Sequence, residues 1–457
     1  MSKTVKEINR KILDKTVRVV TAAEMPAIVE ELGAEGAAAA VDVVTTGTFG
    51  AMCSSGVWLN FGHSEPPIKM TRVWLNDVEA YAGVAAVDAY LGVTQPSETL
   101  SIGYGGAHVI EDLLLSKPVV LRAVSHGTDC YPRKEILTEI TLADLNQAIM
   151  SNPRNAYQRY NAAGNSSAHI LHTYMGKLLP GCGNINYSGA AELSPLINDP
   201  DYATIGIGTR IFLGGGVGYV TGSGTQHNPG AQFATLMVQG DLKQMKVEFL
   251  KAAFFHGYGS SMYIGIGIPI PVLNAAIANK TGIRDRDIET DVMDYAVPSH
   301  SRPVLGRFNY EQLKSGTVRI GGREVPASPL VSYSKSSEVA HTLKQWIEAG
   351  SFLLSEPVAK IPAQGSAEPL ALKPPAQRPD LVYRRRPTVL SRPASPLIAW
   401  DGGLCFSCGQ CLGICPMKVF SRNAKWLVNA DTEKCTGCGR CDRLCPVGAI
   451  GGGQNGR

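Results

Sequence analysis

The chain has 457 residues, 44% of them hydrophobic and 18% charged, which suffices for two or three packed domains. A formal net charge of only +4 argues against nucleic acid or an anionic membrane as the main partner. No apolar run of about eighteen residues escapes interruption, and no apolar signal-peptide core lies in the first twenty residues, so we expect neither a membrane span nor a secretory leader.

Helix start signals stand at four places in the first third of the chain. Each is a capping or turn residue followed by a mixed apolar and polar run, and Gly33 and Gly92 stand where the first two helices should end. The predicted helices cover residues 21–31, 76–91, 108–115 and 141–150. A strand and glycine turn are expected at 101–107, just before the third helix.

Two short runs of β-branched residues, 41–44 and 119–124, predict buried strands between these helices. Each run leads into a loop rich in Gly, Ser and Thr, which contains Cys53 in the first case and Cys130 in the second. The pattern is typical of a large α/β domain with Gly-rich loops. In an open α/β sheet such loops line the crevice beyond the strand ends, where two cysteines could face one pocket.

Proline punctuates the chain between about residues 355 and 399, and apolar periodicity is weak there. Such a segment is a semi-rigid tether or lies over a core. We therefore predict a large domain over residues 1–355, a Pro-rich linker over 356–399, and a small α+β domain resembling bacterial ferredoxins over 400–457.

The final segment contains two C-x₂-C-x₂-C-x₃-C-P runs, the bacterial ferredoxin spacing for [4Fe–4S] clusters. Zinc ribbons usually use paired C-x₂-C arms, which makes zinc the less favoured interpretation. Because the fourth cysteine of each run serves the other cluster, the predicted ligand sets are Cys405, Cys408, Cys411 and Cys445 for one cluster, and Cys435, Cys438, Cys441 and Cys415 for the second. Such clusters imply a reducing compartment, so we place the protein in the cytoplasm.

Three further cysteines, Cys53, Cys130 and Cys182, lie outside this segment. A small buried structural cysteine is the ordinary alternative for each of them. Cys130 follows His126 and Asp129 closely, and these groups are able to ionise or orient a thiol. Cys182 has no ionisable neighbour in sequence and ranks below the other two.

Three blocks of residues carry a resemblance to a known family: the loop around Cys53, residues 101–112, and the loop 127–133 around Cys130. Over roughly residues 5–355 the chain resembles the homocysteine biosynthesis family, whose characterised members are L-aspartate semialdehyde sulfurtransferases of methanogens and other anaerobes. The resemblance implies two important cysteines, which map onto Cys53 and Cys130, the latter the more important. Archaeal relatives often have a separate ferredoxin-type partner, whereas here the ferredoxin is fused.

The activity implied by the resemblance has a definite electron demand. Sulfide adding to the aldehyde of aspartate semialdehyde, with loss of water, leaves a thioaldehyde, and homocysteine requires two more electrons and two protons. Two [4Fe–4S] clusters, fed by a low-potential donor, match this demand. We hypothesise that Cys130 carries sulfur as a persulfide and that Cys53 resolves the intermediate as a disulfide.

Four nearby residues are candidates for the remaining roles, on proximity in sequence alone. His126 and Asp129 are candidates for proton transfer, and Arg133 or Arg72 for binding the substrate carboxylate. Two other functions stay open: a ferredoxin-dependent reductase in which Cys53 and Cys130 form a plain dithiol couple, and a non-catalytic electron-transfer protein. A homo-oligomer is also possible on the sequence.

Overall fold

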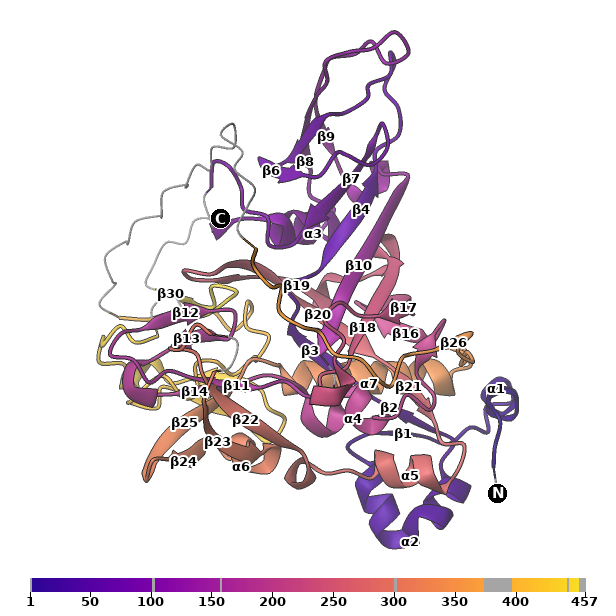
Figure 1. Ribbon diagram of the computed structural model, residues 1–457, viewed down its shortest axis with the longest axis vertical. Coiled ribbons are helices and arrows are strands. Elements are labelled where there is room, and N and C mark those ends of the chain that lie inside the picture. The colour runs from indigo at the N-terminus through magenta and orange to yellow at the C-terminus, as the bar shows by residue number, and fades with distance from the viewer. Residues whose placement is uncertain are drawn as a thin grey trace.

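A computed structural model describes residues 2–100, 103–156, 158–299, 302–373, 397–441 and 444–451 (Figure 1). Its largest element is an antiparallel nine-stranded sheet in the order β19-β20-β16-β17-β18-β10-β4-β7, with β3 paired to β20. The strands are β3 (Thr48–Ala51), β4 (Gly56–Asn60), β7 (Asp88–Gly92), β10 (Gln147–Ala156), β16 (Arg210–Leu213), β17 (Gly216–Ser223), β18 (Thr235–Asp241), β19 (Leu250–Phe255) and β20 (Gly259–Gly267).

Three smaller sheets surround it. A three-stranded sheet joins β1 (Val19–Thr21), β2 (Val43–Thr45) and β21 (Pro269–Pro271). A four-stranded sheet joins β6 (Val78–Ala80), β5 (Arg72–Leu75), β8 (Val119–Val124) and β9 (Glu135–Ile140). A six-stranded sheet joins β23 (Val304–Asn309), β22 (Glu289–Asp294), β11 (Ala162–Gly164), β14 (Ile185–Tyr187), β25 (Arg323–Pro329) and β24 (Thr317–Ile320).

Helices cover the lower part of the molecule in Figure 1, and α7 runs beside β3 and β20. Gly47 permits this approach, since a Cβ there would lie 2.2 Å from the carbonyl oxygen of Ser336 in α7. The α-helices are α1 (Val5–Leu13), α2 (Met25–Ala40), α3 (Gly106–Leu114), α4 (Pro195–Asn198), α5 (Ala275–Thr281), α6 (Tyr310–Lys314) and α7 (Tyr333–Glu348). None of the helices in the described ranges has the length and apolar character that crossing a membrane requires.

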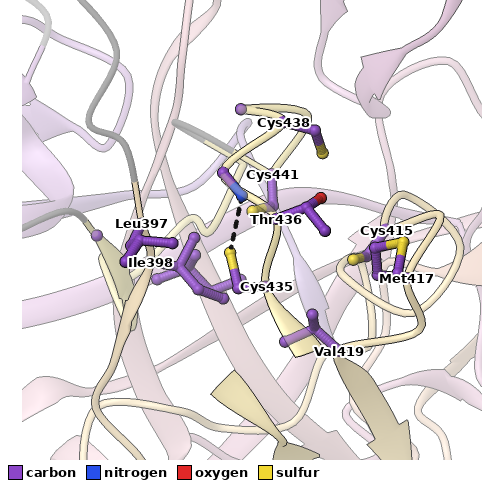
Figure 2. Close-up of a pocket in the computed structure, with 13 residues that line it drawn as sticks. Leu397, Ile398, Cys415, Met417, Val419, Cys435, Thr436, Cys438 and Cys441 are labelled. Atoms are coloured by element: carbon purple, nitrogen blue, oxygen red, sulfur yellow. Dashed lines mark hydrogen bonds between the residues drawn. The ribbon is translucent and has the colours of Figure 1, made fainter. Parts of the chain in front are cut away.

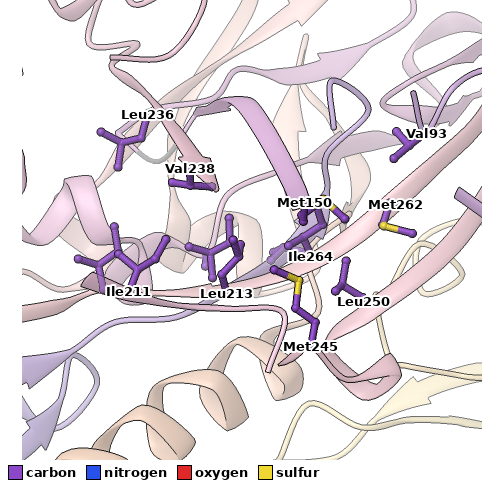
Figure 3. Close-up of a cluster of buried hydrophobic side chains, with 14 of the residues drawn as sticks. Val93, Met150, Ile211, Leu213, Leu236, Val238, Met245, Leu250, Met262 and Ile264 are labelled. Atoms are coloured by element: carbon purple, nitrogen blue, oxygen red, sulfur yellow. The ribbon is translucent and has the colours of Figure 1, made fainter. Parts of the chain in front are cut away.

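The main hydrophobic core lies against the nine-stranded sheet and draws on strands far apart in sequence (Figure 3). Met150 of β10, Leu236 and Val238 of β18, and Met262 and Ile264 of β20 are essentially fully buried there. The strand β20 is buried along nearly its whole length, and it is paired on both edges, with β3 on one edge and with β19 and then β16 on the other. A rigid central strand therefore carries the residues that line the candidate site.

The C-terminal segment forms two short strand pairs, β27 (Ala399–Trp400) with β30 (Ile450–Gly451), and β28 (Phe420–Arg422) with β29 (Val428–Ala430). Its described residues contain one 3-10 turn, Thr432–Lys434, and no α-helix, so the α+β expectation overstates its helical content. Of the predicted linker, residues 374–396 lie outside the described residues. Further upstream, β26 (Ala359–Lys360) pairs with β15 (Gly206–Ile207), which lays this part of the linker on the large domain.

The predicted α/β class is correct as a mixture of helices and sheets, and the largest sheet is antiparallel. Strand β8 covers 119–124 as predicted, and β2 and α3 form close to the predicted positions. The helix predicted from residue 21 begins only at Met25, because Thr21 ends strand β1, and it continues past Gly33, where the backbone kinks at φ 67°, to Ala40. Residues 101 and 102 of the predicted strand lie outside the described residues, and the rest of it forms only a single β-bridge at Gly105.

Two predicted helices are wrong for identifiable reasons. Asn76 and Asp77 adopt left-handed φ values of 49° and 57° and close a two-residue hairpin between β5 and β6, so their turn propensity serves a turn and not a helix cap. At Thr141 the capping box forms, with Asp144 accepting from the Thr141 N–H at 2.7 Å. It closes only the 3-10 turn Leu142–Asp144, because the following residues enter β10 between β4 and β18.

Candidate active site

The eight cysteines of the C-terminal segment form two groups of four. Burial raises the pKa of Cys408, and the neighbouring charges of Cys445 and Cys405 raise it further. The pKa of Cys411 is raised in the same way, by burial and by the neighbouring thiols of Cys408, Cys445 and Cys405. In the other group, burial raises the pKa of Cys441 to about 11, with added effects from Cys415, Cys435 and Cys438. The groups have the same members as the two predicted ligand sets, whose role as cluster ligands stays a prediction.

The second group surrounds a cavity of about 500 Å³, counting the part open to solvent (Figure 2). Backbone amides point at the sulfur atoms: Gly437 N–H donates to Cys435 at 3.4 Å, and in the first group Ser407 N–H donates to Cys405 at 3.3 Å. In the described ranges no three His, Cys, Asp or Glu side chains are arranged so that they could hold a single metal ion. A cubane cluster does not require that, because each cysteine binds a different iron atom.

These two groups suit iron–sulfur clusters on chemical grounds. Thiolates are soft ligands for iron, and amide hydrogen bonds to sulfur are the usual second layer of such sites. Four ionised thiols together in a partly buried site repel one another, and the positive charge of iron offsets that repulsion.

The C-terminal segment, here called the ferredoxin module (residues 397–451), docks firmly on the large domain. Phe254 N–H donates to the Pro446 carbonyl at 2.7 Å, and the Ser332 hydroxyl donates to the Phe406 carbonyl at 2.6 Å. Gly413 N–H donates to the Ser328 hydroxyl at 2.8 Å. The first cysteine group faces a buried aromatic cluster that includes Phe49, Phe255, Tyr263 and Phe406, whereas Cys438 of the second group is exposed.

Cys53 lies in the turn between β3 and β4, close to this docking surface. Its sulfur is 3.0 Å from the hydroxyl of Ser261, which β20 presents to it. Burial raises the pKa of the Cys53 thiol, while hydrogen bonds with Ser261 and Tyr258 and the charge of Arg154 act in the opposite direction. The thiol is therefore held by two hydroxyl groups in a largely enclosed place, and it stays mostly protonated near neutral pH.

Tyr263 connects Cys53 with the first cysteine group. It is fully buried, two residues after Ser261 on the same face of β20, and its ring lies 4.4 Å from that of Phe406. Burial raises the pKa of Tyr263, and the charges of Cys408, Cys445 and Cys53 add to the effect. One tyrosine side chain thus interacts with the large-domain thiol and with two predicted cluster ligands.

Cys130 lies elsewhere, in the loop between β8 and β9, and it is exposed. These strands belong to the lobe formed by the four-stranded sheet, in the upper part of Figure 1. The Cys130 sulfur is 3.6 Å from the Thr128 hydroxyl. This loop packs on residues 63–68, where the rings of His63 and Tyr131 stack at 5.8 Å. Residues 63–68 follow the far end of β4, whereas Cys53 precedes its near end.

The five residues of β4 at about 3.3 Å each separate these ends by roughly 13 Å. Cys53 and Cys130 do not meet within one chain, so the prediction of one shared pocket is wrong for the single chain. The physical reason is that β3 and β8, the strands preceding the two cysteines, belong to different sheets.

The other predicted residues also lie in the lobe. His126 and Asp129 are exposed beside Cys130. The Arg133 guanidinium donates to the carbonyls of Glu65 and Pro66, and Arg72 pairs with Glu79 at 2.7 Å. Neither arginine lies near Cys53. Cys182 is buried in the 3-10 turn Pro180–Cys182, and burial raises its pKa, with Asp294 and Arg323 as its charged neighbours.

Comparison with known proteins assigns the large domain to a family. A family model described as "Homocysteine biosynthesis enzyme, sulfur-incorporation" matches residues 17–354. The chain belongs to this family. A second model, "4Fe-4S dicluster domain", matches residues 404–449, in keeping with iron–sulfur clusters in the module. No solved structure matches the chain.

Two relatives in this homocysteine biosynthesis family carry the name L-aspartate semialdehyde sulfurtransferase. The protein from Methanosarcina acetivorans is 59% identical over 368 residues, which cover 80% of this chain and 74% of the relative. The protein from Methanocaldococcus jannaschii is 57% identical over 388 residues, which cover 82% of this chain and 75% of the relative.

Sequence reasoning missed the residues that surround Cys53 in this family member. Ser261, Tyr258 and Tyr263 are more than 200 positions downstream, and Arg154 about 100. One signal was present: Ser260 and Ser261 form a polar pair at the start of an otherwise apolar strand. A buried hydroxyl in such a strand needs a partner, and here that partner is the Cys53 thiol.

Proposed function

We propose that this chain is an L-aspartate semialdehyde sulfurtransferase that forms L-homocysteine and draws electrons through its own ferredoxin module, which would hold two [4Fe–4S] clusters. The observation that carries the proposal is the position of Cys53, beside Tyr263 and the first cysteine group. Two relatives at 57–59% identity that bear this enzyme name support the choice of substrate.

The overall reaction balances with two electrons. The aldehyde R–CHO and hydrogen sulfide give the thioaldehyde R–CHS and water, and R–CHS with two electrons and two protons gives the thiol R–CH₂–SH. The clusters, when bound by the two cysteine groups, supply single electrons at low potential.

Cys53 is the thiol that receives the thioaldehyde in this proposal. Its sulfur bonds to the sulfur of R–CHS while the carbon takes up the thiol proton, which gives the mixed disulfide R–CH₂–S–S–Cys53 without net oxidation or reduction. Two electrons and two protons then break the S–S bond, releasing R–CH₂–SH and restoring the Cys53 thiol. The hydroxyls of Ser261 and Tyr258, both hydrogen-bonded to this thiol, hold it in place and move its proton.

Cys130 is the sulfur carrier in this proposal. An exposed thiol at the tip of a lobe is accessible to an external sulfur donor, with His126 and Asp129 beside it for proton transfer. A persulfide there, Cys130–S–SH, yields hydrogen sulfide and the free thiol when the low-potential reductant that also feeds the clusters supplies two electrons, together with two protons. The released sulfide then adds to the aldehyde, and Cys53 receives the sulfur as the thioaldehyde, because the two cysteines do not touch within one chain.

The test is anaerobic synthesis of homocysteine by the full chain with its clusters reconstituted. Aspartate semialdehyde, a low-potential reductant and either excess sulfide or a persulfide donor are supplied, and thiol products are identified. Cys53→Ser should abolish homocysteine with both donors, and Cys130→Ser should abolish it only with the persulfide donor. Cys182→Ser is the matched control and should retain activity. Normal homocysteine formation by Cys53→Ser would overturn the mechanism, and no homocysteine from the unaltered chain would overturn the function.

A further inference from the structure

Arg154 lies beside the turn that contains Cys53. Strands β4 and β10 are paired, and at the end of this pairing the side-chain amide of Asn152 in β10 donates to the Ser55 hydroxyl at 2.8 Å. Two residues further along β10, the carbonyl of Arg154 accepts from the Ser54 hydroxyl at 3.3 Å. The backbone of Arg154 is therefore tied to the residue that directly follows Cys53.

A β-bulge interrupts β10 at this position. The register between β10 and β18 shifts between Asn152 and Asn155, and Pro153, inside the shift, has no N–H to offer the ladder. The Arg154 N–H donates to the side-chain oxygen of Asn152 at 3.0 Å. Bulges re-aim side chains and occur often next to active sites. Local sequence thus holds Arg154 in place at the end of the strand pair.

The guanidinium of Arg154 has a neutral partner. Its Nη1 donates to the amide oxygen of Gln226, and no carboxylate of the described residues lies within ion-pair distance of it. Arg159 and Arg307, by contrast, both pair with Asp291. Arg154 is half-buried, as Cys53 is, so a small molecule from solvent is able to reach both. An arginine of this kind is available to a ligand carboxylate, whose oxygens match its N–H groups in geometry.

The charge of Arg154 acts on the candidate active site. Burial raises the pKa of Cys53 and of Tyr258, and the Arg154 charge opposes both rises. The spacing also suits a short substrate. Neighbouring strands lie about 5 Å apart, and a four-carbon amino acid separates its carboxylate carbon from its aldehyde carbon by roughly 4 Å. One such molecule is long enough to contact Arg154 and Cys53 together.

We propose that the Arg154 guanidinium binds the α-carboxylate of the four-carbon amino-acid substrate, so that the opposite end of the molecule lies at the Cys53 sulfur. The identity of the substrate rests on the proposed function. The anion site rests on the place of Arg154 beside Cys53 and on its lack of an acidic partner in the part of the chain that the structure describes. Arg154 replaces Arg133 and Arg72 in this role, since both of those lie in the lobe.

Alkylation of Cys53 tests the site without turnover. Iodoacetate carries a carboxylate, iodoacetamide is its neutral amide, and both react with the same thiolate. The ratio of their rates therefore cancels any effect of Arg154 on the Cys53 pKa. Peptide mass spectrometry of the anaerobic full chain with reconstituted clusters should show a higher iodoacetate-to-iodoacetamide rate ratio at Cys53 than for a neutral small thiol at the same ionic strength.

Variants of Arg154 should change this ratio in a graded way. Arg154→Gln removes a hydrogen bond between charged groups and should lower the ratio about tenfold. Arg154→Lys keeps the charge and should lower it less. Arg319→Gln is the matched control, because Arg319 donates to the carbonyl of Gly322 and lies in β24 at the edge of the six-stranded sheet. Its ratio should stay within about twofold of the unaltered chain.

Protection by a substrate analogue tests the same site from the ligand side. L-Homoserine has the carbon chain and α-carboxylate of aspartate semialdehyde, with an alcohol in place of the aldehyde. It should slow iodoacetamide labelling of Cys53, whereas propanolamine, which is homoserine without its carboxylate, should not. Unchanged thermal unfolding of Arg154→Gln would verify that its fold survives.

Two results would overturn the carboxylate site. One is an equal rate ratio in Arg154→Gln and the unaltered chain, and the other is a ratio at Cys53 of the unaltered chain no higher than that of the small thiol. Arg154-dependent preference for iodoacetate, with homoserine protection, in a chain that makes no homocysteine would instead leave the site standing and remove the proposed function.

Discussion

Nε2 of Gln410 donates a hydrogen bond to the hydroxyl of Tyr263 at 3.4 Å, and this contact joins the strand beside Cys53 to the loop between Cys408 and Cys411. Gln410 and Tyr263 are both buried, so water does not compete for the bond. The pair is the polar part of an otherwise aromatic contact between the large domain and the ferredoxin module.

Tyr263→Phe tests what the hydroxyl adds. The ring and its contact with Phe406 remain, so the module should stay docked. Polar groups near cluster sulfurs stabilise the reduced, more negative state, and their removal should lower the midpoint potential of the nearer cluster, measured by EPR-monitored redox titration. Tyr187→Phe is the matched control, since Tyr187 is equally buried and has no cysteine among the causes of its raised pKa. An identical potential in Tyr263→Phe would show that the hydroxyl plays no part in tuning the cluster.

Ser261→Ala should slow alkylation of Cys53. The thiolate is the reactive form, burial raises the Cys53 pKa, and the Ser261 hydrogen bond counteracts that rise. Without the hydroxyl the pKa moves further up, so the alkylation rate of Cys53 rises only at higher pH than in the unaltered chain. The measurement is the rate of iodoacetamide labelling at Cys53 against pH, by mass spectrometry of the peptide. Ser337→Ala on the exposed face of α7 is the control, and a shift of the profile to lower pH would contradict the role assigned to Ser261.

Ser328→Ala should loosen the ferredoxin module without unfolding the large domain. The Ser328 hydroxyl is buried and accepts from Gly413 N–H at 2.8 Å, and an amide left without its partner in this partly buried contact costs about 1–3 kcal/mol. Hydrogen exchange at Gly413 should therefore quicken by about tenfold or more, since about 1.4 kcal/mol corresponds to a factor of ten. Amides of β20 should keep their protection. Unaltered exchange at Gly413 would mean that this hydrogen bond contributes nothing to docking.

Cys438→Ser should remove only the cluster of the second cysteine group, here called the outer cluster, and leave that of the first group, the inner cluster. Cys438 is exposed and interacts with Cys441 of the second group, whereas the first group is buried against the large domain. Iron and acid-labile sulfide in the purified chain should fall by about half, with the remaining EPR signal belonging to the inner cluster. Cys408→Ser should be more damaging to the docked module, since Cys408 lies in the aromatic contact with Phe49 and Tyr263. Full iron content in Cys438→Ser would refute its assignment as a ligand.

Some of this protein follows from the sequence by itself. The grouping of Cys405, Cys408 and Cys411 follows from spacings of three residues, because so short a loop leaves its thiols little freedom to point apart. Strand β8 follows from a local pattern, a short run of β-branched residues. Family membership also lay in the sequence, in the loops around Cys53 and Cys130.

The tertiary structure alone decided which upstream cysteine lies beside the ferredoxin module. The partners of Cys53 come from β20 and from the chain around Arg154, and strand pairing across such separations depends on the whole sheet and not on neighbouring residues. The same reason explains Asn76, whose side chain suits a helix cap or a hairpin equally well until β8 supplies the strand beside β5. Local sequence sets the loop geometry that can hold a cluster, whereas long-range packing sets what stands next to that cluster.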